Sequence, residues 1–235
     1  MRPFTVFFDR TLEALLPRVC AACERPSGRE VFCALCAETL EPPPPGAVAA
    51  AAFAYGGALA DAIRQAKFHP DELRARALLP AFVEALQRGA MGLPDAPELD
   101  AVTFIPLHWR RRVARGFDLP ALLAKACADT LGLPLLSALR CARLDPPLSL
   151  ASDTGRRAQA VRGRYQARAG TVTGARLLLV DDVVTTGATL REASRVLCEA
   201  GALAVHPLAL AATPRDGEPL PHGPRRALEH CVGAL

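Results

Sequence analysis

The fifteen residues RLLLVDDVVTTGATL, numbers 176–190, decide the fold of this chain of 235 residues. The run Arg176–Val180 has the length and apolar composition of a buried strand. It leads into two adjacent acids, a threonine- and glycine-rich loop, and a pattern that predicts a helix over Leu190–Ala200. A strand, a loop and a helix in this order are typical of βαβ units, whose parallel strands are covered by helices. The stretch therefore predicts an α/β fold.

The same alternation extends outward from this stretch in both directions. Further strands are predicted over 47–55, 101–105, 135–140 and 204–210, and further helices over 58–68, 71–88 and 117–131. Apolar residues make up 51% of the chain and charged residues 22%, which is sufficient for a buried core and argues against general disorder. We therefore expect a mostly parallel sheet with helices on both faces.

A proline run, Pro42–Pro45, interrupts the pattern near the amino terminus and predicts a boundary there. We expect residues 1–45 to form a helix over Phe4–Pro17 followed by a small cysteine-rich unit. Residues 46–235 are expected to form the sheet domain. Its end, from Arg215 onward, is proline-rich and predicts a frayed tail or a short terminal cap.

Four of the eight cysteines lie close together near the amino terminus, in two Cys-x-x-Cys pairs. They are Cys20, Cys23, Cys33 and Cys36. This spacing is typical of a zinc ribbon, in which four thiolates hold a structural Zn²⁺ tetrahedrally and leave no open coordination position. A redox-active pair is the alternative, but it would account for only one of the two pairs. We therefore expect a structural zinc site.

The acids and the loop after the strand 176–180 predict a ligand site. Ligands of open parallel sheets bind at the carboxyl ends of the strands, where Asp181 and Asp182 stand. The loop and helix start at Thr185–Thr189 offer hydroxyls and free backbone N–H groups, which suit a phosphate group. Carboxylates would repel a bare phosphate, but they can accept hydrogen bonds from the hydroxyls of a sugar phosphate. The predicted ligand is therefore a ribose 5-phosphate group.

Three segments resemble a known family. Residues 176–190 resemble the phosphoribosyl pyrophosphate (PRPP) binding motif of type I phosphoribosyltransferases. The segment TFIPLHWRRRVARGF, numbers 103–117, resembles the ComF subfamily, as does Tyr55-Gly-Gly followed by Ile63–Phe68. Including the four cysteines, the resemblance covers residues 12–212. The chain departs from the subfamily pattern at four positions, which carry Asp118, Leu119, Leu148 and Ala160 where members commonly have Asn, Gln, Gln and Asn.

The resemblance implies a type I phosphoribosyltransferase-like fold and a transferase reaction. A nitrogen nucleophile would displace pyrophosphate from carbon 1 of PRPP, with Mg²⁺ bound to the diphosphate and the ribose hydroxyls. Asp181 and Asp182 would be the catalytic residues, holding the ribose hydroxyls and stabilising the developing oxocarbenium cation. The 5-phosphate would bind to Thr185, Thr186, Gly187, Ala188 and Thr189, and the departing pyrophosphate to Arg110, Arg111, Arg112 and Arg115. The sequence names neither the acceptor nor an activating base.

Several basic residues keep more than one interpretation. The arginine run after 101–105 is a pyrophosphate clamp, a solvated basic turn, or a contact for single-stranded DNA with Trp109 or Phe117 as a stacking surface. The polar segment 142–172 resembles the family's mobile loop, which closes over PRPP, with a disordered basic loop as the alternative. Lys67, in a chain rich in arginine, suggests a specific role, whereas a lysine reaching to solvent from a helix end is the plainer interpretation.

Charge and hydropathy argue against two classes, purely electrostatic nucleic-acid binders and membrane-spanning proteins. The net charge of +4 is well below that of a purely electrostatic nucleic-acid binder. No window approaches the about 18 consecutive apolar residues of a membrane span, so a cytoplasmic protein is expected. Two readings besides a transferase stay open. One is a non-catalytic PRPP-pocket protein that contacts single-stranded DNA during DNA uptake, and the other is a purely structural zinc-ribbon adaptor.

Overall fold

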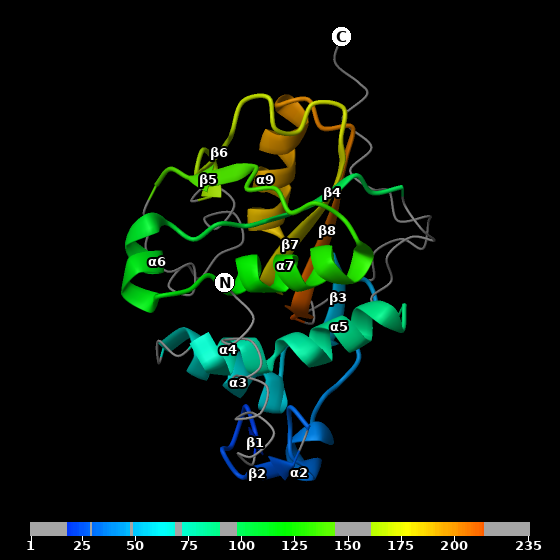
Figure 1. The fold of residues 1–235 in the computed structure, drawn as a ribbon, viewed down its shortest axis with the longest axis vertical. Helices are drawn as coiled ribbons and strands as arrows, with labels where there is room; N and C mark the ends of the chain where they lie inside the picture. Colours follow the sequence, from blue (N-terminus) through cyan, green and yellow to red (C-terminus); the bar gives the residue numbers. More distant parts are fainter. Residues whose placement is uncertain are drawn as a thin grey trace, which may run out of the picture.

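A four-stranded parallel sheet forms the centre of the molecule. The computed structural model describes residues 18–28, 30–47, 49–68, 72–89, 98–143 and 161–213. The sheet order is β3 (Ala50–Ala54), β8 (Ala204–Ala212), β7 (Arg176–Val184) and β4 (Ala101–Phe104) (Figure 1). All three strand pairs are parallel, with Val180 of β7 opposite Leu208 and Phe104. The predicted α/β fold with a mostly parallel sheet is confirmed.

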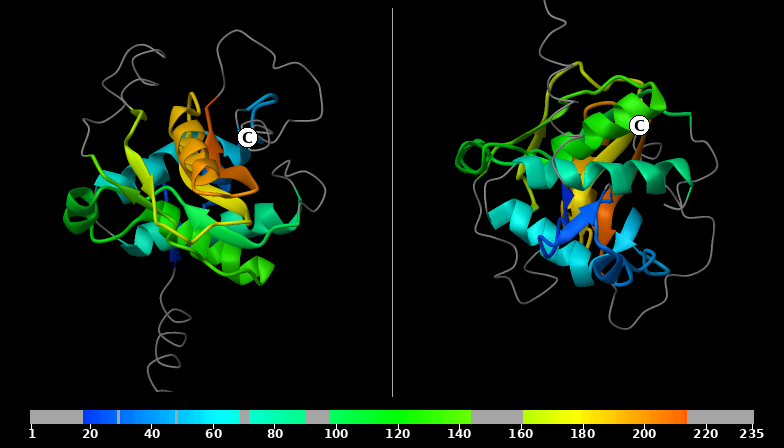
Figure 2. Two further views of the ribbon diagram at one scale, coloured as in Figure 1. Left: turned by 90° about the horizontal axis from the view of Figure 1, so that it is seen from above. Right: turned by 60° about the horizontal axis from the view of Figure 1, so that its bottom comes forward.

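Helices cover both faces of this sheet, as predicted (Figure 2). One face carries α3 (Gly57–Phe68), α4 (Glu72–Ala77), α5 (Leu79–Gln87) and α7 (Leu119–Leu131), and the other carries α9 (Ala188–Glu199). Successive residues of a strand point to opposite faces. Leu178 accordingly packs with the core under α3, α5 and α7, and Leu179 with the core under α9. This alternation continues into the acids at the end of β7.

Three local differences separate the structure from the predicted elements. The helix predicted over 71–88 is broken into α4 and α5, because Pro80 has no N–H to donate to the carbonyl of residue 76. The strand predicted over 135–140 is interrupted: Leu135 forms a single parallel bridge with Val102 of β4, and a short β5 (Leu139–Cys141) pairs antiparallel with β6 (Tyr165–Ala167). The arginine run forms a helix, α6 (Trp109–Arg115), ended by Gly116 at φ 82°.

The cysteine-rich segment packs onto the sheet domain. Its elements are β1 (Arg18–Val19), β2 (Pro26–Gly28) and α2 (Ala34–Ala37). Cys20, Ala21, Ala22 and Phe32 belong to the same buried cluster as residues of α3, α5 and α7. The residues before and after the expected boundary at 45/46 therefore contribute to one hydrophobic core.

Some predictions fall outside the described residues. These are the helix over 4–17, the tail from Arg215, and the part of the polar segment that holds Leu148, Arg156, Arg157 and Ala160. Among the helices that the structure describes, none is long and apolar enough to cross a membrane.

Candidate functional site

A cavity of about 440 Å³ opens at the carboxyl end of β7. One wall is the continuous stretch from Asp181 to Leu190, which runs from the strand through the loop into the first turn of α9. The opposite side is formed by Tyr55, which follows β3, and by Lys67 of α3. The two acids and the threonine–glycine loop, which the sequence predicted to form one site, therefore line one cavity.

The loop before α9 is shaped for an anion. Gly187 is the residue before the helix and has φ 72°, in the left-handed region that favours glycine. The Thr186 hydroxyl oxygen accepts a hydrogen bond from the Ala188 N–H at 3.4 Å. The N–H groups in the first turn of a helix lack carbonyl partners within the helix and carry a partial positive charge. This end of the cavity therefore suits a phosphate group.

The two acids at the end of β7 are both buried, each with 8% of its surface exposed. Burial raises the pKa of Asp181 well above its usual value, and the neighbouring Asp182 raises it further. Asp182 has a cationic partner, since Lys67 Nζ lies 2.7 Å from its Oδ2. The cavity therefore contains two buried carboxyl groups and one ammonium group, so this part of its lining is strongly polar.

Lys67 was not among the site residues predicted from the sequence. Reaching to solvent was the plainer interpretation of this side chain, but its ammonium group reaches the cavity and pairs with Asp182 instead. Two signals were present in the sequence: lysine is rare, since Lys67 and Lys125 are the two lysines of the chain, and Lys67 lies in the segment Ile63–Phe68 that resembles the subfamily. The contact joins the end of α3 to the end of β7 and could not be read from local spacing.

The arginine run lies beside the cavity but does not line it. Arg110 and Arg112 are exposed on α6, and the Arg110 guanidinium stands 5.3 Å from the centre of the Trp109 ring. Arg115 is turned inward: burial lowers its pKa, while the charges of Asp182 and Asp118 act in the opposite direction. Arg115 thus interacts electrostatically with Asp182, one of the two acids of the site. Arg111, also on α6, is half-buried.

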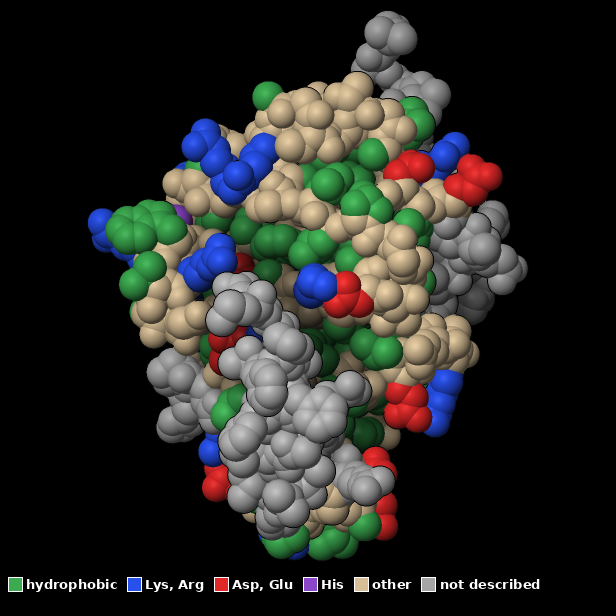
Figure 3. Space-filling model, in the orientation of Figure 1, with side chains coloured by type: hydrophobic (Ala, Val, Ile, Leu, Met, Phe, Trp, Pro, Cys, Tyr) green, Lys and Arg blue, Asp and Glu red, His purple; other side chains and the backbone are tan. Residues whose placement is uncertain are grey.

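The exposed face of α6 combines hydrophobic side chains with basic ones (Figure 3). Trp109 is 62% exposed and Val113, one helical turn later, 75% exposed. Phe117, the other predicted stacking surface, is buried at 4% exposure because it packs in the core beneath α7. The prediction of Phe117 as a surface for bases is therefore wrong, whereas Trp109 is accessible.

A buried carboxyl group ties the segment before α6 to α7. Asp118, 5% exposed, accepts a hydrogen bond through Oδ2 from the Leu107 N–H at 2.9 Å. Burial raises its pKa to about 6, although the hydrogen bond from Leu107 favours the charged form. The negative charge of Asp182 raises it further. Asp118 is the position where the subfamily commonly has Asn, so this chain places an extra buried acid next to the site.

Asp118→Asn should stabilise the protein at neutral pH. The pKa of about 6 lies above the usual 3.8, so the folded protein binds this proton more tightly and the unfolding free energy falls as pH rises from about 4 to about 6. That difference corresponds to about 3 kcal/mol, of which an amide should recover about 1–3 kcal/mol above pH 6 and almost none at pH 4. Urea unfolding at pH 4.0 and 7.5 measures this.

The control for that variant is Asp129→Asn on the same helix. Asp129 is exposed and pairs with Lys125, so its loss should change the unfolding free energy by less than about 1 kcal/mol at either pH. A loss of stability in Asp118→Asn at pH 7.5 would show that the carboxylate is favoured in the folded protein.

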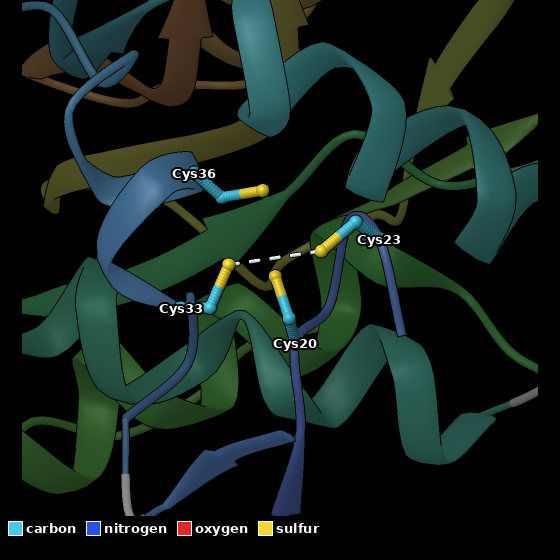
Figure 4. A group of neighbouring side chains, drawn as sticks. All are labelled: Cys20, Cys23, Cys33 and Cys36. Carbon is cyan, nitrogen blue, oxygen red and sulfur yellow. Dashed lines mark hydrogen bonds between the residues drawn. The ribbon is translucent and has the colours of Figure 1, made fainter. Parts of the chain in front are cut away.

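The four amino-terminal cysteines point toward one another (Figure 4). Their sulfur atoms all lie within 4.8 Å of each other, and Cys23 Sγ is 3.7 Å from Cys33 Sγ. A zinc ion with Zn–S bonds of 2.3 Å places its sulfur ligands about 3.8 Å apart. The donor set and its spacing therefore fit a tetrahedral metal ion such as zinc, and the predicted grouping of Cys20, Cys23, Cys33 and Cys36 is confirmed.

Comparison with known proteins agrees with the site. The family model described as phosphoribosyl transferase domain matches residues 122–230. The DNA utilization protein YhgH of Salmonella typhi is 28% identical over 193 residues, covering 80% of this chain and 81% of that protein. YhgH of Salmonella typhimurium strain LT2 is 29% identical over 178 residues, covering 72% of this chain and 74% of that protein.

A solved structure also shows similarity. Glutamine PRPP amidotransferase from B. subtilis, complexed with ADP and GMP, is 28% identical over 57% of this chain, with a TM-score of 0.38. The similarity spans 26% of that enzyme. The matched domain includes β7, the loop and α9, and the similarity to YhgH extends over most of the chain. Residues 122–230 therefore match the phosphoribosyl transferase domain, most of the chain is similar to the YhgH proteins, and a four-cysteine cluster lies ahead of the matched domain.

Proposed function

We propose that the protein binds PRPP with Mg²⁺ in the cavity at the end of β7 and transfers the phosphoribosyl group to a nitrogen nucleophile, releasing pyrophosphate. One observation carries this proposal. Two buried carboxyl groups and the start of α9 lie along one wall of a single cavity, so hydroxyl acceptors and an anion site stand next to each other. A ribose 5-phosphate unit presents the matching pair of groups, hydroxyls at one end and a phosphate at the other.

The residues take roles that follow from charge. In the transfer, the bond between carbon 1 and the pyrophosphate oxygen breaks, the electron pair leaves with pyrophosphate, and a bond forms from the nucleophile nitrogen to carbon 1. The proton that this nitrogen loses passes to solvent. Positive charge develops on the ribose ring, next to Asp181 and Asp182, which stabilise it. Arg115, with Arg110, Arg111 and Arg112, neutralises the negative charge that collects on pyrophosphate. The N–H groups and hydroxyls of 185–189 hold the 5-phosphate in place.

Two metal ions belong to the proposal. Mg²⁺ prefers oxygen ligands, which Asp181 and Asp182 offer together with PRPP itself, and it would supply charge neutralisation on the diphosphate. Zn²⁺ would occupy the four cysteines. Because four thiolates leave no coordination position for a substrate, that ion would be structural.

The face of α6 favours a second candidate function. Trp109 and the exposed Arg110 and Arg112 offer a stacking ring and phosphate contacts for single-stranded DNA, and the curated relatives are named DNA utilization proteins. In this alternative the PRPP pocket is a binding site without turnover, and α6 contacts DNA during uptake.

Titration calorimetry with PRPP and Mg²⁺ tests the proposed function, followed by pyrophosphate release in the presence of candidate bases. Binding together with release supports the transferase, and binding without release under any acceptor supports the second candidate. Absence of PRPP binding by folded, metal-loaded protein would overturn both.

Arg115→Ala should weaken PRPP binding about tenfold or more, while the affinity for ribose 5-phosphate changes little. The reason is that a hydrogen bond to a charged group contributes about 1.5–3 kcal/mol and that only PRPP carries the diphosphate. Calorimetry with the two ligands measures the difference. Equal losses for both ligands would contradict a pyrophosphate clamp.

The variant Arg110→Ala/Arg112→Ala is the matched comparison, because it removes the outward arginines of the same helix. A selective loss of PRPP affinity assigns these residues to the clamp. Unchanged PRPP affinity, with weaker single-stranded DNA binding and a flatter salt dependence, assigns them to the second candidate function.

A further inference from the structure

Helix α3 is bound to the cysteine-rich segment near its carboxyl-terminal end. Gln65 Nε2 donates a hydrogen bond to the carbonyl oxygen of Ala22 at 2.6 Å, and Ala22 lies between Cys20 and Cys23. The same side chain accepts a hydrogen bond at Oε1 from Arg74 of α4 at 2.7 Å. Arg74 in turn pairs with Glu24 at 2.6 Å, directly after the first cysteine pair. The first pair is therefore tied to the end of α3 directly and through α4.

The amino-terminal end of α3 is bound to the second cysteine pair. Thr39 Oγ1 accepts a hydrogen bond from the Ala58 N–H at 3.0 Å and donates one to the carbonyl oxygen of Cys36 at 2.8 Å. The two segments are in close contact here: a Cβ at Gly57 would lie 2.7 Å from Thr39 Oγ1, so only glycine fits. One hydroxyl group thus joins the second cysteine pair to the start of the helix.

The body of α3 is buried in the same cluster as the first cysteine pair. Ile63 and Ala66, 1% and 0% exposed, belong to one core with Cys20 and Ala22. Packed interiors transmit small displacements instead of absorbing them. The position of α3 should therefore follow the position of the cysteine-rich segment.

Helix α3 also supplies the cation of the cavity. Lys67, two residues after Gln65, places Nζ 2.7 Å from Asp182 Oδ2. A displacement of the helix end by about 1 Å would take these atoms outside ordinary hydrogen-bond distance. The contacts at Thr39 and Gln65 lie at the two ends of the helix that sets this distance.

We propose that Lys67 is a further residue of the phosphoribosyl site. Gln65 and Thr39 are positioning residues: through their contacts with α3, the presence or absence of metal at the four cysteines changes the position of Lys67. Metal loading then holds Lys67 against Asp182 and raises the affinity of the cavity for PRPP. The ligand named here rests on the proposed function, whereas the coupling between the cluster and Lys67 does not.

The coupling is tested by chemical labelling of Lys67. Because Lys67 and Lys125 are the two lysines, Lys125 on exposed α7 surface serves as an internal reference in the same sample. Acylation of the two amines by a lysine-reactive ester is followed by mass spectrometry. Thr39→Val and Gln65→Ala leave all four cysteines in place. Each should raise the acylation rate of Lys67 several-fold and leave the rate of Lys125 unchanged. Removing the metal with a chelator should likewise raise the rate of Lys67 and not that of Lys125.

Two further variants guard against a general loss of structure. Thr39→Ser keeps the hydroxyl group and should restore the slow labelling of Lys67. Arg64→Ala changes the exposed face of α3, where Arg64 pairs with Asp61, and should leave it slow. Slow labelling of Lys67 in both Thr39→Val and Gln65→Ala would overturn the proposal, regardless of the affinity that these variants have for PRPP.

A double-variant cycle tests whether Gln65 acts through Lys67. In calorimetry, Gln65→Ala and Lys67→Met should each lower PRPP affinity about tenfold, the effect of one charged hydrogen bond. In the Lys67→Met background, Gln65→Ala should have almost no further effect, because the cation it positions is already gone. Additive losses would contradict the positioning role. If no variant binds PRPP, the proposed function fails, while the labelling result still decides the coupling.

Discussion

Cys20→Ser/Cys23→Ser is expected to lose the bound metal and to unfold the segment before Pro42. The apolar side chains of this segment are few, and Cys20 itself is part of its buried contact with α3. Structural zinc contributes about 10–16 kcal/mol in comparable small sites, far more than such a segment gains by burial alone. Elemental analysis should give one zinc ion per chain for the wild type and none for the variant, and limited proteolysis should cut the variant ahead of Pro42.

Cys141→Ser is the control for this experiment. Cys141 is half-buried at the end of β5 and is not part of the four-cysteine cluster, so its replacement should leave zinc content and proteolysis unchanged. Finding no metal in reduced protein purified without chelator, or a disulfide among the four cysteines, would contradict a structural zinc site.

Asp181→Asn/Asp182→Asn is expected to lower PRPP affinity by at least a factor of about ten, since each charged hydrogen bond to a ribose hydroxyl contributes about 1.5–3 kcal/mol. Ribose 5-phosphate should lose affinity as well, because it carries the same hydroxyls. The variant should remain folded: burial raises the pKa of Asp181, so an amide there removes an unfavourable charge. Calorimetry with both ligands, alongside urea unfolding, measures the two effects.

Asp61→Asn is the matched control, a single carboxylate on the exposed face of α3 that should leave both affinities unchanged. Unchanged PRPP affinity in a folded Asp181→Asn/Asp182→Asn protein would remove the carboxylates from the ribose site and leave the cavity with an anion-binding loop alone.

The order of strands and helices could be read from the sequence because it depends on local patterns. The apolar run before Asp181 is buried on both faces of a parallel sheet, and the alternation with amphipathic helices has no other simple packing. The same locality made the site wall predictable, since Asp181–Thr189 follow one another along a strand, a loop and a helix start. The four cysteines were predictable because metal-ligand spacing is also a local feature.

Local patterns misjudged the elements whose conformation depends on capping or pairing. A solvated basic turn was one of the three interpretations of the arginine run, but the run forms α6. The His108 side chain accepts a hydrogen bond from the Arg110 N–H at 3.3 Å, and Gly116 ends the helix. His108 itself is buried. The strand expected over 135–140 depends on β6, a partner that no local pattern indicated.

What the sequence by itself determined is therefore the α/β fold, the acid and threonine wall of the cavity, and the cysteine cluster. The tertiary structure alone decided that Lys67 meets Asp182, that Asp118 is a buried acid next to them, and that the cysteine-rich segment shares its core with α3. The physical reason is that helical and strand periodicities record only which side of an element is buried. Which side chains meet across the core is set by packing between elements distant in sequence.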